Sequence, residues 1–128
     1  MARAHIRAVA AATVSALALL LLAAGAHAAI PIVLANRATA DEATAAKEIA
    51  TYFGLMAGEK WSVTPEAMAG RQASAVWVGP TAFARRHGVN CARLAPEEWV
   101  LKTVGKSLIV AGGRPRGTLY SVYRFLED

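Results

Sequence analysis

Short apolar runs separated by turn residues predict a sheet of several strands. Gly79 and Pro80 stop one run sharply, and its continuous apolar character around Trp77 indicates a central strand. Gly105 and Lys106 join the last two runs, and glycine first in a two-residue connection is typical of a type II′ hairpin turn. The predicted strands lie within residues 30–35, 60–64, 73–78, 98–104 and 107–111.

A helix is predicted after the first strand. Thr39 followed three residues later by Glu42 fits a capping box, in which two side chains satisfy amide groups at the helix start. Gly58 is expected to end this helix, because glycine favours the left-handed conformation found there. Its apolar stripe, at helical spacing, comprises Ala45, Ala46, Ile49, Tyr52, Phe53 and Met56.

The end of the chain carries a second long helical pattern. Its expected apolar stripe is Leu119, Val122, Tyr123 and Leu126. A shorter helix is predicted over residues 81–87, whereas residues 65–72 contain proline, glycine and polar residues and are expected to form a loop.

The order of these elements predicts an α+β fold. A small sheet, mixed or antiparallel, with the two main helices packed on one face is the arrangement that buries both stripes. Residues 29–128 provide enough chain for one domain and no room for a second.

The first 28 residues have the pattern of a secretory signal peptide. Arg3 and Arg7 supply a short positive region, and a long uncharged apolar stretch follows. Ala26 and Ala28 place small side chains where signal peptidase requires them, so cleavage is expected after Ala28. The alternative is a retained membrane anchor, but the stretch is shorter than the about 20 residues of a spanning helix and is rich in alanine. We therefore expect an exported protein, periplasmic or secreted, with no membrane segment after cleavage.

Charge and composition exclude several classes of function. The chain has 14 basic and 9 acidic residues, and without the two arginines of residues 1–28 its formal charge is +3. The basic residues are scattered, and the cluster Arg85-Arg86-His87 is too short for a nucleic-acid surface, so no nucleic-acid partner is expected. Cys91 is the one cysteine, which rules out an internal disulfide; we expect it to be a buried apolar residue.

Catalytic and metal-binding groups are not expected in the mature chain. Glu97 and Glu98 are adjacent, so on a strand they point to opposite faces and cannot share a cleft. His87 is the one histidine after residue 28, which leaves neither a complete triad nor the three or four ligands of a zinc site. A nucleophile–base pair of Cys91 and His87 is disfavoured, since Gly88 interrupts a helix between them. No cofactor is expected.

Residues 112–118 are the most suggestive local feature. A glycine turn that opens a helix, with Arg114 and Arg116 beside it, can hold an anion on free amide groups. No phosphate-loop pattern is present, so the favoured interpretation is a tight strand-to-helix connection with both arginines facing solvent or a partner. The three tryptophans lie in predicted strands, and packing is favoured over a sugar-stacking platform.

The order of elements and the final segment resemble a known class of domain. The segment from Gly112 to Glu127 reads Gly-Gly-Arg-Pro-Arg-Gly-Thr-Leu-Tyr-Ser-Val-Tyr-Arg-Phe-Leu-Glu. It is similar to the close of the amino-terminal domain that precedes the catalytic barrel in α-glucuronidases, β-hexosaminidases and related secreted glycoside hydrolases. The resemblance covers essentially all of residues 30–128.

The resemblance implies a non-catalytic accessory domain of an exported carbohydrate-degrading enzyme. Such a domain packs against a (β/α)₈ barrel that carries the catalytic carboxylates, so no catalytic residue is carried over to this chain. The barrel would be expected shortly after Asp128, and the chain is therefore expected to be a fragment or truncated product. The alternative is a self-sufficient secreted module that binds a glycan or a protein through exposed aromatic rings.

The signal peptide gives a direct prediction. Amino-terminal sequencing of the chain recovered from the periplasm of a bacterial expression host should begin at Ala29, because Ala26 and Ala28 satisfy the peptidase. A protein that still begins at Met1 and sediments with the membrane would instead support the retained anchor.

Overall fold

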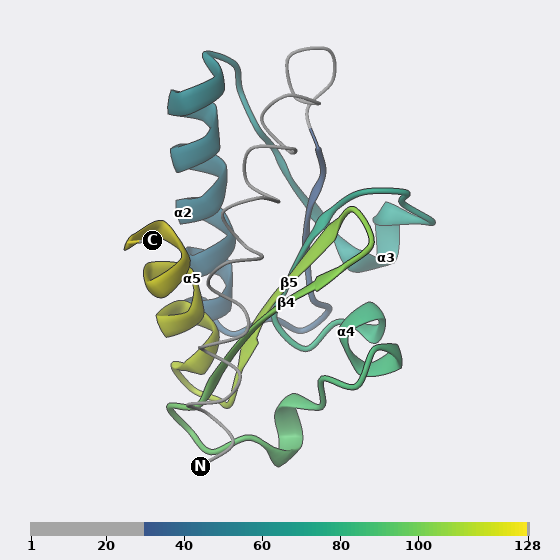
Figure 1. The fold of residues 1–128 in the computed structure, drawn as a ribbon, viewed down its shortest axis with the longest axis vertical. Helices are drawn as coiled ribbons and strands as arrows, with labels where there is room; N and C mark the ends of the chain where they lie inside the picture. Colours follow the sequence, from purple (N-terminus) through teal and green to yellow (C-terminus); the bar gives the residue numbers. More distant parts are fainter. Residues whose placement is uncertain (1–29, 128) are drawn as a thin grey trace.

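Five short strands form one sheet with helices on both of its sides (Figure 1). The computed structural model describes residues 30–127, so the predicted signal peptide and its cleavage after Ala28 lie outside the described residues. The elements in chain order are β1 (Ile32–Leu34), α2 (Ala40–Ala57), β2 (Val63–Pro65), α3 (Glu66–Ala69), β3 (Val76–Val78), α4 (Ala82–Arg86), the 3₁₀ turn η1 (Cys91–Arg93), β4 (Trp99–Val104), β5 (Ser107–Gly112) and α5 (Gly117–Glu127).

The sheet is mixed and has the order β2-β1-β3-β5-β4. Its first four strands in that order run parallel, and β4 pairs antiparallel with β5 through the predicted hairpin. Gly105 has φ 58 whereas Lys106 does not have a positive φ, as a type II′ turn requires. The third strand, β3, lies at the centre of the sheet, which confirms the prediction made from its continuous apolar sequence.

The two long helices, α2 and α5, pack side by side on one face of the sheet (Figure 1). The α+β fold with two main helices on one face is therefore confirmed. Phe53 of α2 and Phe125 of α5 meet edge to face, with ring centroids 5.8 Å apart. Trp61 also packs against Phe53 in a tilted arrangement, with ring centroids 5.0 Å apart.

The opposite face is covered by the short helices α3 and α4 and by η1. This second core includes Val33, Trp77 and Ile109 from the strands. Because both faces are covered, the central strands are apolar at every position, and the three residues of β3 are all buried.

Helix α2 starts and ends where the sequence predicts. Thr39 accepts a hydrogen bond from the Glu42 amide, and the Glu42 carboxylate accepts one from the Thr39 amide, which completes the capping box. Gly58 ends the helix in the left-handed conformation, with φ 70. Two members of the predicted stripe, Tyr52 and Met56, are instead exposed, because the buried face of α2 is the narrower one formed by Ala45, Ala46, Ile49 and Phe53.

Two further expectations from the pattern are wrong. Residues 66–69 form the short helix α3 instead of a loop, because the Asn36 side chain accepts a hydrogen bond from the Ala67 amide at 3.1 Å. On α5, Tyr123 is exposed and Phe125 is buried. The buried face of this helix is centred on Val122 and Phe125 and not on the stripe that contains Tyr123.

The connection from β5 to α5 gives a prediction about stability. A Cβ atom on Gly113 would overlap the carbonyl oxygen of Ala95, a backbone atom that has little freedom to move. Gly113→Ala should therefore lower the free energy of unfolding by more than about 3 kcal/mol, measured by urea denaturation. Gly58→Ala is the control: nothing lies within 4 Å of its Cβ position, and the cost should be about 1 kcal/mol for its positive φ. Equal losses of unfolding free energy in the two variants would show that the close approach of Gly113 to Ala95 adds no cost.

Candidate functional site

The carboxyl ends of four parallel strands meet at one edge of the sheet. The strands on either side of β1 are β2 and β3, so the chain order reverses direction at this point. In open α/β sheets, ligands bind in the crevice at such a switch point. The segment after β1 leads into α2, and the segment after β5 leads into α5. A ligand-binding site is therefore expected at this edge of the sheet.

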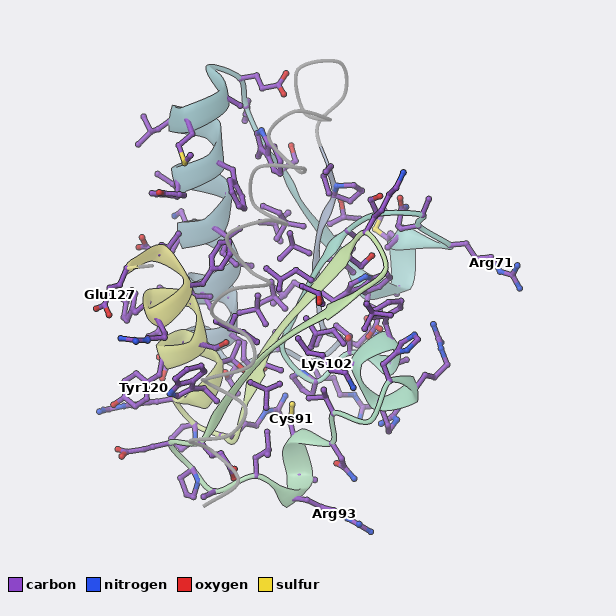
Figure 2. All side chains as sticks on the ribbon, viewed as in Figure 1. Arg71, Cys91, Arg93, Lys102, Tyr120 and Glu127 are labelled. Atoms are coloured by element: carbon purple, nitrogen blue, oxygen red, sulfur yellow. The ribbon has the colours of Figure 1, made fainter. Side chains whose placement is uncertain are left out.

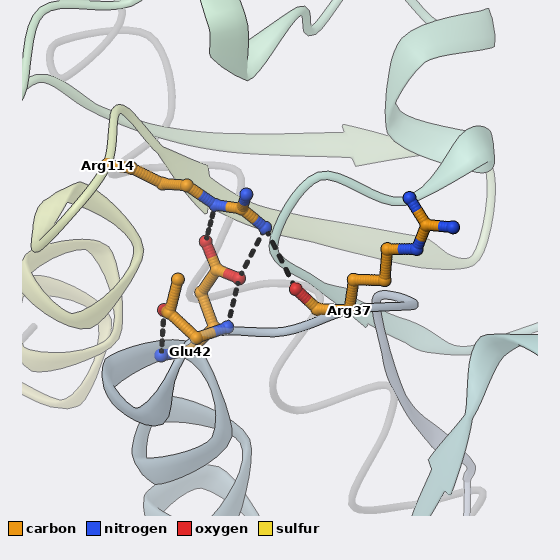
Figure 3. A network of polar contacts seen from close by, with 4 residues as sticks. Arg37, Glu42 and Arg114 are labelled. Carbon is orange, nitrogen blue, oxygen red and sulfur yellow. Dashed lines mark hydrogen bonds and ion pairs between the residues drawn. The ribbon is translucent and has the colours of Figure 1, made fainter.

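An ion pair between a buried carboxylate and a half-exposed arginine occupies this position (Figure 3). The Nε atom of Arg114 donates to Oε2 of Glu42 at 2.9 Å, and Nη2 donates to Oε1 at 3.1 Å. Oε1 also accepts the Thr39 amide at 2.9 Å. The carboxylate thus receives three hydrogen bonds, two of them in the bidentate geometry that makes arginine–carboxylate pairs strong.

Glu42 lies beneath the arginine and against the backbone of the strand ends. Its side chain is 1% exposed, whereas that of Arg114 is 47% exposed. A Cβ on Gly79 would lie 3.6 Å from the Glu42 Cδ atom and 3.4 Å from the Ala35 Cβ atom. The pair therefore joins the segments that follow β1, β3 and β5 at the switch point of the sheet.

Arg114 also contacts the segment after β1. Its Nη2 donates to the carbonyl oxygen of Arg37 at 3.3 Å, and Arg37 has a left-handed φ of 54 (Figure 3). The hydrogen bond to Glu42 raises the pKa of Arg114 above its ordinary value, and the negative charge of Glu42 adds to this effect. The guanidinium thus stays charged and holds the two segments together.

Arg116 has a different environment from Arg114. It is exposed at the start of α5, and hydrogen bonding to the Tyr120 side chain is the main cause that raises its pKa, with the charge of Asp41 contributing less. The two candidate arginines therefore differ in their contacts. Arg114 donates hydrogen bonds to Glu42 and to the Arg37 carbonyl, whereas Arg116 is exposed. Contact of either residue with an anion or a partner stays a prediction.

Other helix starts at this edge are also capped by the chain's own side chains. Glu66 Oε2 accepts the Ala82 amide at 2.7 Å, and Thr81 Oγ1 accepts the Ala84 amide at 3.0 Å. These donors of α4 are therefore not free to hold an anion.

The tryptophans are packing residues, as the sequence favoured. Trp61 and Trp77 are each 4% exposed and belong to the cores on opposite faces of the sheet, and Trp99 is half-buried against the first core. The Nε1 atoms of Trp61 and Trp77 are buried without an acceptor among the described residues. Neither ring offers a face for stacking on a sugar.

The acidic residues, the histidine and the cysteine do not form a reactive cluster. Glu98 lies in the turn before β4, where its Oε1 accepts the Ala95 amide at 3.0 Å, and Glu97 is exposed. Cys91 points from η1 toward the sheet (Figure 2), and burial raises the pKa of its thiol, which favours the protonated form over the nucleophilic thiolate.

Residues 30–127 contain no group of three histidine, cysteine or acidic residues that could hold a metal ion. Within the same range, no helix is long and apolar enough to cross a membrane.

One feature that the sequence analysis missed is a groove on the outer side of α2. It has a volume of about 520 Å³ and lies between α2 and residues 60–63, with Lys47 on the helix and Lys60 on the facing segment. No sequence motif predicts this groove, because its walls come from two segments whose relative position depends on tertiary packing. The buried role of Glu42 was also missed, since the capping box accounts for one of its three hydrogen bonds.

No protein-family model matches the sequence, and no curated protein matches it either.

The ion pair gives a prediction about stability. Arg114→Gln should lower the free energy of unfolding by about 2 kcal/mol, because it leaves the buried Glu42 carboxylate without its charged partner. A fall of about 10 °C in Tm is expected for a domain of this size, measured by circular dichroism.

Arg116→Gln is the matched control, since it removes an exposed arginine two residues away. It should change stability by less than about 0.5 kcal/mol. If both variants unfold at the same temperature, the Glu42–Arg114 ion pair does not stabilise the domain.

Proposed function

We propose that this chain is a non-catalytic accessory domain of an exported carbohydrate-degrading enzyme. It is of the type that precedes the barrel in α-glucuronidases and β-hexosaminidases. It acts by packing against a partner domain, a (β/α)₈ barrel in a full-length relative. The proposal is supported by the α+β fold, and by an internal ion pair that lies at the switch point of the sheet.

The observation that carries the proposal is an uncovered apolar surface on α2. Tyr52, Leu55 and Met56 are spaced three and four residues apart, so they are neighbours on the helix, and their side chains are 38%, 80% and 50% exposed. Figure 1 shows α5 against the amino-terminal part of α2, while the last turns of α2 continue beyond it. We call these three residues the α2 patch. An exposed apolar group of this kind marks a surface for another protein.

The alternative function, a self-sufficient module that binds glycans through aromatic rings, has less support. The exposed aromatic side chains among the described residues are Tyr52 and Tyr123, and the rings of Trp61 and Trp77 are buried. A change in tryptophan fluorescence on titration with xylan or chitin oligosaccharides would favour this alternative.

The role of the α2 patch can be tested with one substitution. Leu55→Asp should reduce the fluorescence of a bound apolar dye by about half without a change in Tm, because Leu55 contributes surface and not core packing. The same variant should fail to form a complex with the barrel of an α-glucuronidase expressed without its own amino-terminal domain. Sedimentation velocity measures that complex.

Met68→Asp is the matched control. Met68 is 78% exposed, but it lies on α3, on the opposite side of the sheet from α2 (Figure 1). This variant should bind the dye and the barrel as the unmodified chain does. A chain that binds neither the dye nor the barrel would overturn the proposed function.

A further inference from the structure

The groove on the outer side of α2 has one helical wall and one extended wall. Ala50, Gly54 and Leu55 contribute from the helix, and Trp61 and Val63 contribute from the segment that enters β2. Its volume of about 520 Å³ is within the range of sites that bind small ligands or peptide side chains. The groove is thus an open, mainly apolar depression between α2 and the segment that leads into β2.

The strand beside the groove is the edge of the sheet. Among the described strands, β2 pairs with β1 on one side and with no strand on the other. Alternate backbone amides and carbonyls of an edge strand point away from the sheet and can pair with another chain. In β2 the amide hydrogens come from Val63 and Thr64, since Pro65 has none. An edge strand next to a helix is the arrangement in which an extended peptide adds to a sheet.

The charges at the groove specify the chemistry of its occupant. Lys47 and Lys60 are both exposed, and they lie on opposite walls. Their neighbours Glu48 and Glu59 do not line the groove. A segment that carries apolar side chains together with carboxylates is complementary to this combination of apolar walls and two ammonium groups.

We propose that an extended acidic and apolar segment of a partner protein binds in this groove as an added strand beside β2. This inference deepens the proposed function and rests on it, since it gives the chemistry of the partner segment. The groove adjoins the α2 patch at Leu55, but Lys47 and Lys60 belong to the groove and not to the patch.

The test is a titration of the ¹⁵N-labelled chain with the peptide acetyl-Ser-Leu-Asp-Val-Asp-Leu-Ser-amide, followed by amide chemical shifts. Saturable shifts are expected at residues 60–64 and along the outer side of α2. The variant with Lys47→Glu and Lys60→Glu should bind about tenfold more weakly, because two attractive contacts become repulsive. Lys106→Glu is the control, since Lys106 lies in the hairpin turn between β4 and β5, and it should bind unchanged.

Three modified probes decide between the outcomes. The same peptide with lysine in place of aspartate should not bind, and equal binding would overturn the role of Lys47 and Lys60. A peptide with methylated amide nitrogens at alternate residues should also fail, because it cannot pair with a strand edge. If that peptide binds as well as the first, or if decanoate binds and the peptides do not, strand addition is overturned.

The two proposals fail separately. A barrel complex that forms although no peptide binds would overturn the groove inference and leave the accessory function. Peptide binding without a barrel complex would overturn the accessory function.

Discussion

The Glu42–Arg114 ion pair is the interaction on which the rest of the structure depends. It links residues 72 positions apart and joins the start of α2 to the segment between β5 and α5. The arginine adds a contact to the Arg37 carbonyl, so the segments that follow the first and last parallel strands are held together. Because Glu42 is buried, its carboxylate is stable here through its three hydrogen bonds, and the loss of the guanidinium would leave an unpaired charge in the protein.

The position of this pair also bears on function. Folds with parallel strands place their ligand sites where the chain order reverses, because loops and helix starts there leave a crevice with free amide groups. In this chain the crevice contains an arginine and a carboxylate, and side chains of Glu66 and Thr81 take up amides at the start of α4. The polar side chains named here therefore stabilise the connections between strands and helices at this edge of the sheet.

The surfaces that we propose for a partner lie elsewhere, at the end of α2 and beside β2, the edge strand among the described residues. The exposed end of α2 follows from its length, since α2 has 18 residues while β1 and β2 have three each. A helix of this length rises about 27 Å, far beyond a three-residue strand, so the carboxyl end of α2 continues past α5 (Figure 1). Leu55 is consequently exposed, and Lys47 and Lys60 remain at a groove that the domain itself does not fill.

The sequence by itself determined the local features of this protein. The Thr39 and Glu42 capping box, the stop at Gly58, the Gly105 turn and the central position of β3 all depend on residues close together in the chain, and each agrees with the structure. Tertiary structure decided which helical positions are buried: Phe125 replaced Tyr123, and Tyr52 lies outside the core, because burial depends on what a neighbouring element covers. It also decided that Glu42 would bind Arg114. A contact between residues so far apart has no local signal, since it exists only after the strands bring their ends to the same edge.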